Sequence, residues 1–269
     1  MKNNSNLKLF YNKVYKKGEE KHFTSFIAKG TPTDEVKEVL KELNWKNKLI
    51  LDVGCGTGLF AYKVSKLGPK KVLGIDFSKE AIDIAQKTHK NHNLQYQFLD
   101  VKEIKLKYDV IVSLGTLEHM DNPLKTLKTL KKHLSKNGKI IITSPNWTNP
   151  RGYILMTLWH LFNSPITLAD LHYQTPVDFQ EYAKKLNMNF KWRTIDRSWA
   201  HGDILISDFK KRIPNVLKDS KLPNNPAQIK KFLNWIESHV LSFDNSLPHS
   251  GATGLYIFSF KKQSSGSTV

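Results

Sequence analysis

Three glycines at alternate positions, Gly54, Gly56 and Gly58, directly follow an apolar run. Glycine lets a backbone turn sharply and approach a ligand without a Cβ clash, so a strand that leads into such a loop is typical of a cofactor site. The dinucleotide pattern G-x-G-x-x-G does not fit, because its third glycine would fall at Leu59. An acid, Asp52, stands two residues before the first glycine. The segment therefore predicts a binding loop for a cofactor other than NAD or FAD.

Two further acids stand where predicted strands end. Asp76 ends the second strand and Asp100 the third. A carboxylate at the end of the second strand can accept hydrogen bonds from both hydroxyls of a ribose. Because the carboxyl ends of parallel strands meet at one edge of a sheet, we expect both acids beside the glycine loop.

Histidines are the candidates for acid–base chemistry. His119 follows the fourth predicted strand, and His172 lies in the loop before a later helix. Both positions would face the carboxyl ends of the strands, where open α/β sheets bind ligands. His22 and His201 are further possibilities, and each of these rings could instead be a hydrogen-bonded loop residue. We take His119 and His172 as the predicted catalytic residues.

The elements that must position these residues alternate along the chain. Seven apolar runs are predicted strands: 48–53, 71–75, 95–99, 108–113, 139–143, 189–195 and 255–260. Helices are expected to begin near Gly58, Ser78, Pro123, Pro176 and Pro226, the last with apolar residues at helical spacing. Strand–helix alternation up to residue 145 indicates right-handed βαβ units and a parallel sheet.

Four segments make up the expected organisation. Residues 1–30, polar and aromatic, form an N-terminal lid, and residues 31–145 form the cofactor-binding core. Residues 146–262 supply substrate-side helices and the last two strands of the same domain, with a helical insertion at about 198–252. Residues 263–269 are expected to be disordered. The apolar run 153–162 is about half as long as a spanning helix, which predicts a core or interfacial segment.

The formal net charge of +18 raises the question of nucleic acid or an anionic membrane surface. Only four of the 42 basic residues are arginines, whereas nucleic-acid sites favour the planar arginine fork. This excess of lysine over arginine predicts a solvated lysine surface and disfavours a nucleic-acid partner. It leaves weak contact with a membrane surface open. Cys55 is the single cysteine, so no intrachain disulfide is possible and a cytoplasmic location is expected. Within the glycine loop it is read as a small packed residue rather than a nucleophile.

Taken together, these motifs resemble those of class I S-adenosylmethionine-dependent methyltransferases. The resemblance rests on residues 51–58, 74–77, 98–101, 117–119 and 134–139, the last as a turn before the fifth strand. It implies a Rossmann-like, mostly parallel seven-stranded α/β sheet with helices on both faces and S-adenosyl-L-methionine as cofactor. In the family, an acid placed like Asp100 typically receives the adenine amino group, and the next residue packs near the ring. The implied cofactor-binding residues are Asp52, Gly54, Cys55, Gly56, Gly58, Asp76, Phe77, Asp100, Val101 and Ser113.

Within that family the sequence is most similar to the broad group that includes ubiquinone-pathway O-methyltransferases. In that group an additional acid often precedes the Leu-Glu-His element and can help to hold a metal. This chain has Gly115 there, so no metal ligand is predicted. Residues expected to roof a substrate pocket are Tyr11, Tyr15, Phe23, Trp147, Tyr153 and Trp159.

The expected function is methyl transfer to a hydroxyl of a small molecule. One alternative is an RNA or protein methyltransferase, although the Asn/Asp-Pro-Pro-aromatic motif of amino-methylating nucleic-acid enzymes is replaced here by residues 114–117. A second alternative is a homologue that binds the cofactor without catalysing transfer. Detection of S-adenosylhomocysteine after turnover would separate these two.

We predict that NAD and FAD do not bind, because Leu59 stands where the dinucleotide pattern needs its third glycine. Thermal shift measurements with each cofactor test this. S-adenosylmethionine at saturation should stabilise the fold by a few kcal/mol, about 2.7 at a hundredfold excess over Kd. Stabilisation by NAD alone would overturn the interpretation.

Overall fold

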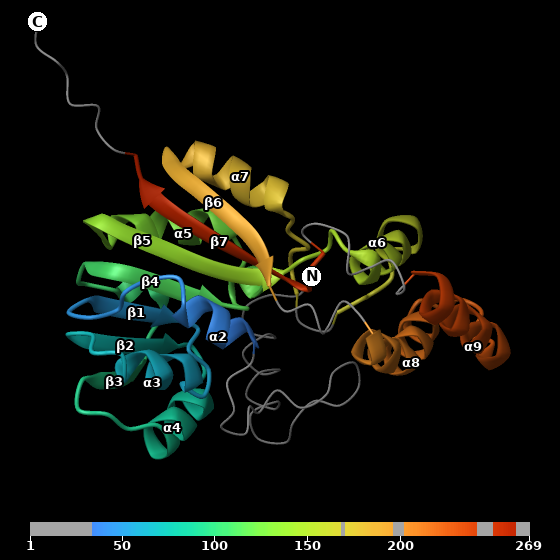
Figure 1. Ribbon diagram of the computed structural model, residues 1–269, viewed down its shortest axis with the longest axis horizontal. Coiled ribbons are helices and arrows are strands. Elements are labelled where there is room, and N and C mark those ends of the chain that lie inside the picture. Colours follow the sequence, from blue (N-terminus) through green and yellow to red (C-terminus); the bar gives the residue numbers. More distant parts are fainter. Residues whose placement is uncertain (1–33, 168–169, 196–201, 241–249, 262–269) are drawn as a thin grey trace, which may run out of the picture.

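The computed structural model describes residues 34–167, 170–195, 202–240 and 250–261 (Figure 1). Its centre is a seven-stranded sheet of order β3-β2-β1-β4-β5-β7-β6, in which β7 is antiparallel to both neighbours and the other pairs are parallel. The strands are β1 (Leu49–Val53), β2 (Lys71–Asp76), β3 (Leu94–Phe98), β4 (Tyr108–Leu114), β5 (Leu134–Pro145), β6 (Met188–Ile195) and β7 (Thr253–Phe260). The predicted sheet is confirmed. The expected N-terminal lid, which contains His22, and the expected C-terminal tail lie outside the described residues, and so does His201.

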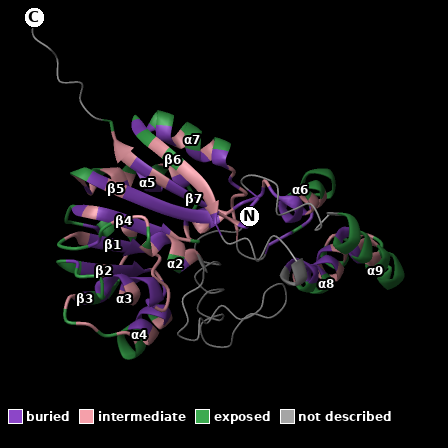
Figure 2. Ribbon diagram, viewed as in Figure 1, coloured by how far each residue is buried: buried purple, intermediate pink, exposed green. Residues whose placement is uncertain are grey.

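Apolar side chains fill both faces of the sheet, because successive strand residues point to opposite sides. Ile50 packs with Val112 on one face, whereas Leu51 packs with Ile111 on the other. The first face is covered by α2 (Asp34–Leu40), α3 (Leu59–Ser65) and α4 (Lys79–Thr88), and the second by α5 (Pro123–Lys132) and α7 (Pro176–Lys185). Buried residues are concentrated along the central strands (Figure 2). Helices therefore cover both faces, as expected.

One predicted turn is wrong. Residues 134–139 were expected to form the turn before the fifth strand, but β5 begins at Leu134. Tyr108 pairs with Leu134 and Val110 pairs with Lys139, so residues 135–138 bulge opposite a single residue of β4. The bulge is tight, because a Cβ at Gly138 would lie 2.7 Å from the Leu134 side chain. Turn-forming residues within this segment produce an irregularity in a strand rather than a break between elements.

A separate group of helices extends beyond the carboxyl ends of the parallel strands (Figure 1). It comprises α6 (Pro150–Phe162), α8 (Gly202–Asp219), α9 (Pro226–Trp235) and the π-helical turn η4 (Ile236–Val240). These helices share an apolar cluster of their own, which includes Leu155, Phe209 and Leu233. The insertion before the last strand was expected with one helix, but it also contains α8, whose apolar residues have helical spacing although Pro214 lies inside the helix.

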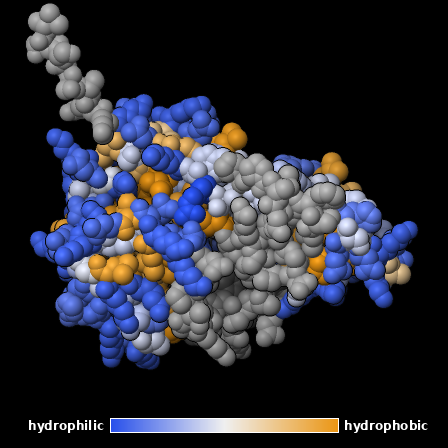
Figure 3. Space-filling model, in the orientation of Figure 1, coloured by the Kyte–Doolittle hydropathy of each residue, from blue (hydrophilic) through white to orange (hydrophobic). Residues whose placement is uncertain are grey.

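Helix α6 contains the apolar run singled out in the sequence. Leu155 is fully buried within the helical cluster, whereas Tyr153, Leu161 and Phe162 are exposed. No helix in the described ranges is both long and apolar enough to cross a membrane. Hydrophilic side chains cover much of the face in Figure 3, with apolar ones in smaller patches. The run thus contributes to packing on one side only.

Packing of α7 on the sheet depends on one aromatic stack, which gives a prediction about stability. Phe179 is fully buried, and its ring centroid lies 3.8 Å from that of Tyr256 at an interplanar angle of 16°. Phe179→Ala should lower the free energy of unfolding by about 3–5 kcal/mol through lost contacts and a cavity. Val177→Ala, exposed on the same helix, should change it by less than about 0.5 kcal/mol. Urea denaturation measures both, and equal effects would contradict the assigned packing.

Candidate active site

The glycine loop connects β1 with α3 and is bonded to the end of β2. Gly54, Gly56 and Gly58 have φ angles of +71°, +51° and +83°, a region that residues with a Cβ rarely adopt. The Gly54 N–H donates to the Ile75 carbonyl at 2.8 Å, and the Gly56 N–H donates to Oδ2 of Asp76 at 2.9 Å. These bonds hold the loop and the Asp76 carboxylate in a fixed relation.

Packing leaves no room for a side chain at two of these glycines. A Cβ at Gly54 would lie 2.4 Å from the Thr116 side chain, and one at Gly58 would lie 2.5 Å from the Tyr96 hydroxyl. The same hydroxyl donates to the Gly58 carbonyl at 2.9 Å. The protein's own contacts therefore require glycine at both positions, whatever ligand the loop holds.

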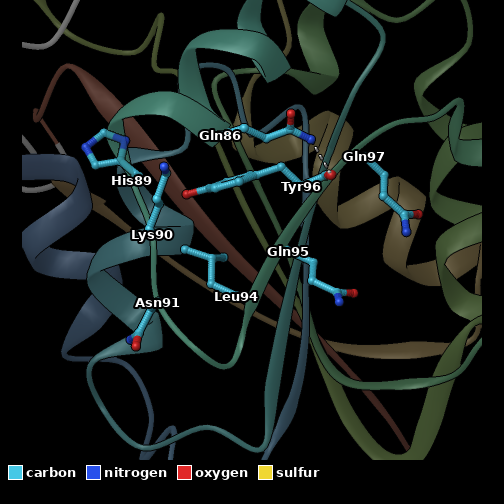
Figure 4. A pocket seen from close by; sticks show the side chains of 8 residues that line it. All are labelled: Gln86, His89, Lys90, Asn91, Leu94, Gln95, Tyr96 and Gln97. Carbon is cyan, nitrogen blue, oxygen red and sulfur yellow. Dashed lines mark hydrogen bonds between the residues drawn. The ribbon is translucent and has the colours of Figure 1, made fainter.

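A pocket lies along β3 and the end of α4, on the outer side of Tyr96 (Figure 4). It is lined by Gln86, His89, Lys90, Asn91, Leu94, Gln95, Tyr96 and Gln97. Gln86 Nε2 donates to the Tyr96 carbonyl there at 3.2 Å. None of the predicted site residues lines this pocket, so the candidate active site lies elsewhere, at the carboxyl ends of the strands.

Two buried acids, Asp52 and Asp76, stand at the glycine loop. Asp76 accepts backbone N–H bonds on both oxygens, from Gly56 and from Ser78 at 2.8 Å. Burial raises the pKa of Asp76, and these bonds oppose the rise. Burial, with the Asp76 charge beside it, raises the pKa of Asp52 to about 8. Among the described residues, Oδ2 of Asp52 has no hydrogen-bond partner.

This arrangement fits a positively charged cofactor. A buried carboxylate oxygen without a partner is costly, and a cation placed beside it would restore the lost interaction. S-adenosylmethionine, implied by the resemblance, carries an ammonium and a sulfonium. We therefore keep Asp52 as a predicted cofactor-binding residue and Asp76 as a predicted ligand of the ribose, where each Asp76 oxygen has a second lone pair.

The other predicted cofactor residues lie around the same edge. Asp100 is exposed and uses Oδ1 to cap the 3-10 turn η1 (Val101–Glu103), accepting from Lys102 N at 2.8 Å. Phe77 and Val101 are half-buried at the ends of β2 and β3, and Ser113 is fully buried in β4. Burial first, then the charges of Asp52 and Asp76, raises the pKa of the Cys55 thiol. The thiol is therefore neutral, which favours a packing role over nucleophilic chemistry.

The predicted base His119 has an acidic partner that the sequence did not indicate. His119 ends the 3-10 turn η2 (Leu117–His119) after β4, and its Nδ1 lies 3.3 Å from Oδ1 of Asp170. The side chains are 14% and 11% exposed, so water screens the pair only weakly. The two atoms are within ion-pair distance but not in hydrogen-bond geometry, so the contact is electrostatic.

Glu118 fixes the chain around this pair. Its carbonyl accepts the N–H groups of Leu171 at 2.9 Å and His172 at 3.1 Å, which joins η2 to the segment that carries Asp170. Burial first, then the Asp170 charge, raises the pKa of the Glu118 carboxyl well above its usual range. Burial thus favours the protonated form of Glu118, and Asp170 is the carboxylate within ion-pair distance of His119.

The second predicted base, His172, is engaged with the backbone. Its Nε2 lies 2.9 Å from the Met120 carbonyl, a contact in which the nitrogen donates. The remaining nitrogen, Nδ1, is the one that would accept a proton. His172 thus lies in the same loop cluster as His119 but also helps to hold that cluster together.

The predicted pocket aromatics divide into two groups. Trp147 and Trp159 both pack edge-on against Tyr173, with ring centroids 5.2 and 4.7 Å apart. Tyr153 instead points into solvent, 60% exposed. Tyr11, Tyr15 and Phe23 lie outside the described residues. Trp147 and Trp159 therefore remain the described aromatics nearest to the expected acceptor side.

Asp170 is the functional candidate that the sequence analysis missed. Its one signal is its place two residues before His172, and nothing in the sequence pairs it with His119. In the described part of the chain, no group of three or more His, Cys, Asp or Glu residues is arranged to hold a metal ion.

Comparison with known proteins agrees with the class that the fold and glycine loop define. A family model described as a methyltransferase domain matches residues 25–190. The chain therefore belongs to this family and contains a methyltransferase domain of the S-adenosylmethionine-dependent class.

Two curated relatives differ in what they act on. A tRNA U34 carboxymethyltransferase of Campylobacter fetus is 37% identical over 107 residues, which cover 37% of each chain. The match therefore spans well under half of that relative's length. A ubiquinone biosynthesis O-methyltransferase of Pelagibacter ubique is 32% identical over 173 residues, 57% of this chain and 69% of that protein.

Among solved structures, a magnesium protoporphyrin IX methyltransferase from Synechocystis with bound S-adenosylhomocysteine has a TM-score of 0.50 at 18% identity. The match covers 58% of this chain and 73% of that one. At this identity it supports the fold alone.

We predict that cofactor binding releases about one proton at pH 7. The pKa of Asp52 is about 8 without the cofactor, so the acid is mostly protonated at pH 7, and a bound cation would favour its ionised form. The release should fade above pH 8, where Asp52 is already ionised. Isothermal titration in buffers of different ionisation enthalpy measures it.

Asp52→Asn should bind more weakly and lack the release, whereas Asp83→Asn, at an exposed acid on α4, should behave as wild type. Equal proton release by wild type and Asp52→Asn would remove Asp52 from the cofactor site.

Proposed function

We propose that the protein methylates a hydroxyl of a small-molecule acceptor, with His119 as general base and Asp170 as the residue that positions its ring. When bound, S-adenosylmethionine would supply an activated methyl group, with the thioether sulfur as the leaving group of an in-line displacement by the acceptor oxygen at the methyl carbon. Most catalysis of such a step comes from positioning. The hydroxyl also loses its proton, and a base within hydrogen-bond reach speeds that loss by about 10²–10⁴-fold.

The observation that carries the proposal is the His119–Asp170 pair. The pair lies at the end of β4, and β4 pairs directly with β1, which leads into the glycine loop. Asp170 would orient the ring and stabilise the imidazolium that forms when Nε2 takes the proton. The ubiquinone-pathway relative, an O-methyltransferase by name, also supports a hydroxyl acceptor.

An RNA acceptor is a second candidate, favoured by the tRNA-modifying relative and by the net charge of +18. It requires phosphate contacts that depend steeply on salt. Release of S-adenosylhomocysteine with bulk tRNA, suppressed between 50 and 200 mM salt by about 10³–10⁵-fold for six to ten contacts, would favour RNA. Release with hydroxylated small molecules, insensitive to salt, would favour the first candidate.

We predict that His119→Ala lowers kcat by about 10²–10⁴-fold while cofactor affinity stays nearly unchanged. Asp170→Asn should lower kcat less and shift the pH profile, because it changes the base through its partner. The wild-type rate should rise with pH as the base loses its proton. Steady-state release of S-adenosylhomocysteine measures all three.

The controls for this prediction are two other histidines. His92→Ala, at an exposed position after α4, should keep wild-type rates. His172→Ala tests the other predicted base. A lower kcat in His172→Ala, together with normal turnover in His119→Ala, would assign the role of general base to His172. A double variant that is no slower than the slower single variant would mean that the two act as one unit.

A further inference from the structure

Arg151 is a buried guanidinium whose terminal nitrogens have no acceptor. It is the second residue of α6 and only 8% exposed. Its Nε donates to Oδ2 of Asp208 at 3.2 Å. Among the residues that the structure describes, neither Nη1 nor Nη2 makes a hydrogen bond. Burial of an arginine is usually accompanied by full use of its planar fork, so two unused nitrogens require an explanation.

Asp208 cannot supply the missing contacts, because Arg212 already occupies it. Arg212 is fully buried and donates from Nε to both Asp208 oxygens, at 3.1 and 2.9 Å, and from Nη2 to Oδ1 at 2.8 Å. Its Nη1 donates to the Ile166 carbonyl at 3.0 Å. Two guanidinium groups therefore share one carboxylate, and the more weakly held one is Arg151. Burial and the charge of Arg212 both lower the pKa of Arg151.

Two observations relate Arg151 to the predicted base His119. Arg151 stands just after β5, at the edge of the sheet where His119 follows β4. The charge of Asp170, the partner of His119, acts on Arg151, although the two do not approach within ion-pair distance. Trp147, in the same connection, is 3% exposed and its Nε1 also lacks an acceptor among the described residues. The segment 147–151 thus holds one fully buried donor without an acceptor, Trp147 Nε1, and the Arg151 Nη groups, which bond to none of the described residues.

We propose that Arg151 binds an oxyanion of the methyl acceptor, a carboxylate or a phosphate, and so selects anionic acceptors. This inference rests on the proposed function, since it places the acceptor beside His119. A planar oxyanion would take both Nη groups in the bidentate geometry that arginine favours. Asp208 and Arg212 are then positioning residues, which hold the Nε edge of Arg151 and leave its other edge for the ligand. The first-turn location on α6 adds the positive end of a helix to the same binding position.

A structural brace is the competing explanation, and it predicts a different use of the side chain. A brace would direct the Nη groups to carbonyls or to a second carboxylate, as Arg212 does. The charged groups that act on Arg151 are Arg212, Asp208 and Asp170, and Asp170 lies within ion-pair distance of His119. An anion bound at Arg151 would give this guanidinium a negative partner that it does not share with Arg212.

The test uses the small number of arginines. The chain has four, so selective ¹⁵N-arginine labelling gives at most four Nε–Hε signals. The intact protein, saturated with S-adenosylhomocysteine, is titrated separately with acetate, inorganic phosphate and acetamide at constant ionic strength. Loss of one signal in Arg151→Lys identifies the Arg151 resonance. Arg193, paired with Glu38 and Glu42 and 41% exposed, is the internal control for non-specific binding to a cationic surface.

The Arg151 signal should shift and saturate in the millimolar range with acetate, phosphate or both, and should not respond to acetamide. The oxyanion that saturates the Arg151 signal identifies whether the ligand group is a carboxylate or a phosphate. Arg151→Gln should weaken that binding at least tenfold by calorimetry, and the wild-type titration decides alone if this variant does not fold. A response no larger than that of Arg193, or an equal response to acetamide, would overturn the proposal. Turnover is not measured, so a failure of His119 as base leaves this result unaffected.

Discussion

The hydrogen bonds between the glycine loop and the end of β2 determine where the rest of the site can lie. The Gly56 N–H reaches the Asp76 carboxylate only because Gly54, Gly56 and Gly58 adopt left-handed backbone conformations. Tyr96 closes the loop from the side of β3, and Thr116 closes it from the chain that follows β4. The loop therefore links four strands at their carboxyl ends. Because that edge is fixed by packing, acids delivered to it are held in place before any ligand arrives, which is the condition for catalysis by positioning.

Ionisable groups are buried at this edge at a cost to stability. Asp52 and Glu118 are each 2% exposed, and burial raises the pKa of both carboxyls. Arg151 and Arg212 share the single carboxylate of Asp208. A fold selected for stability alone would place apolar residues at such positions, since a buried charge is seldom a net gain. A cation bound on the cofactor side would offset the cost of burying the carboxyls, and an anion bound on the acceptor side would offset the cost of burying the guanidinium groups. The residues that lower the stability of the free protein would therefore strengthen ligand binding.

The sequence predicted the sheet better than it predicted the site. All seven strands follow from short apolar runs, because burial between two helical layers imposes a pattern that is visible locally. The bulge at residues 135–138 was mistaken for a turn, because glycine and asparagine suit both. Helix α8 was missed although its apolar residues have helical spacing, because Pro214 inside it is typical of a helix end or a loop. Asp170 was missed for a more general reason. Its role depends on a contact with His119 from a distant part of the chain, and such contacts leave no local pattern.

Cofactor and acceptor functions are distributed differently along the chain. The family match covers residues 25–190 and so includes the glycine loop, His119, Asp170 and Arg151. It ends before α8, which contributes Asp208 and Arg212 to the environment of Arg151. Relatives that share the matched part act, by their names, on acceptors as different as tRNA and ubiquinone precursors. An insertion that packs against a residue of the matched part, such as Arg151, can therefore change what that residue binds. Contacts with the insertion determine which hydrogen-bond donors of the residue are bonded within the protein and which are left for a ligand. On this view the acceptor is encoded less in the core motifs than in the charge balance between the core and the α8–α9 insertion.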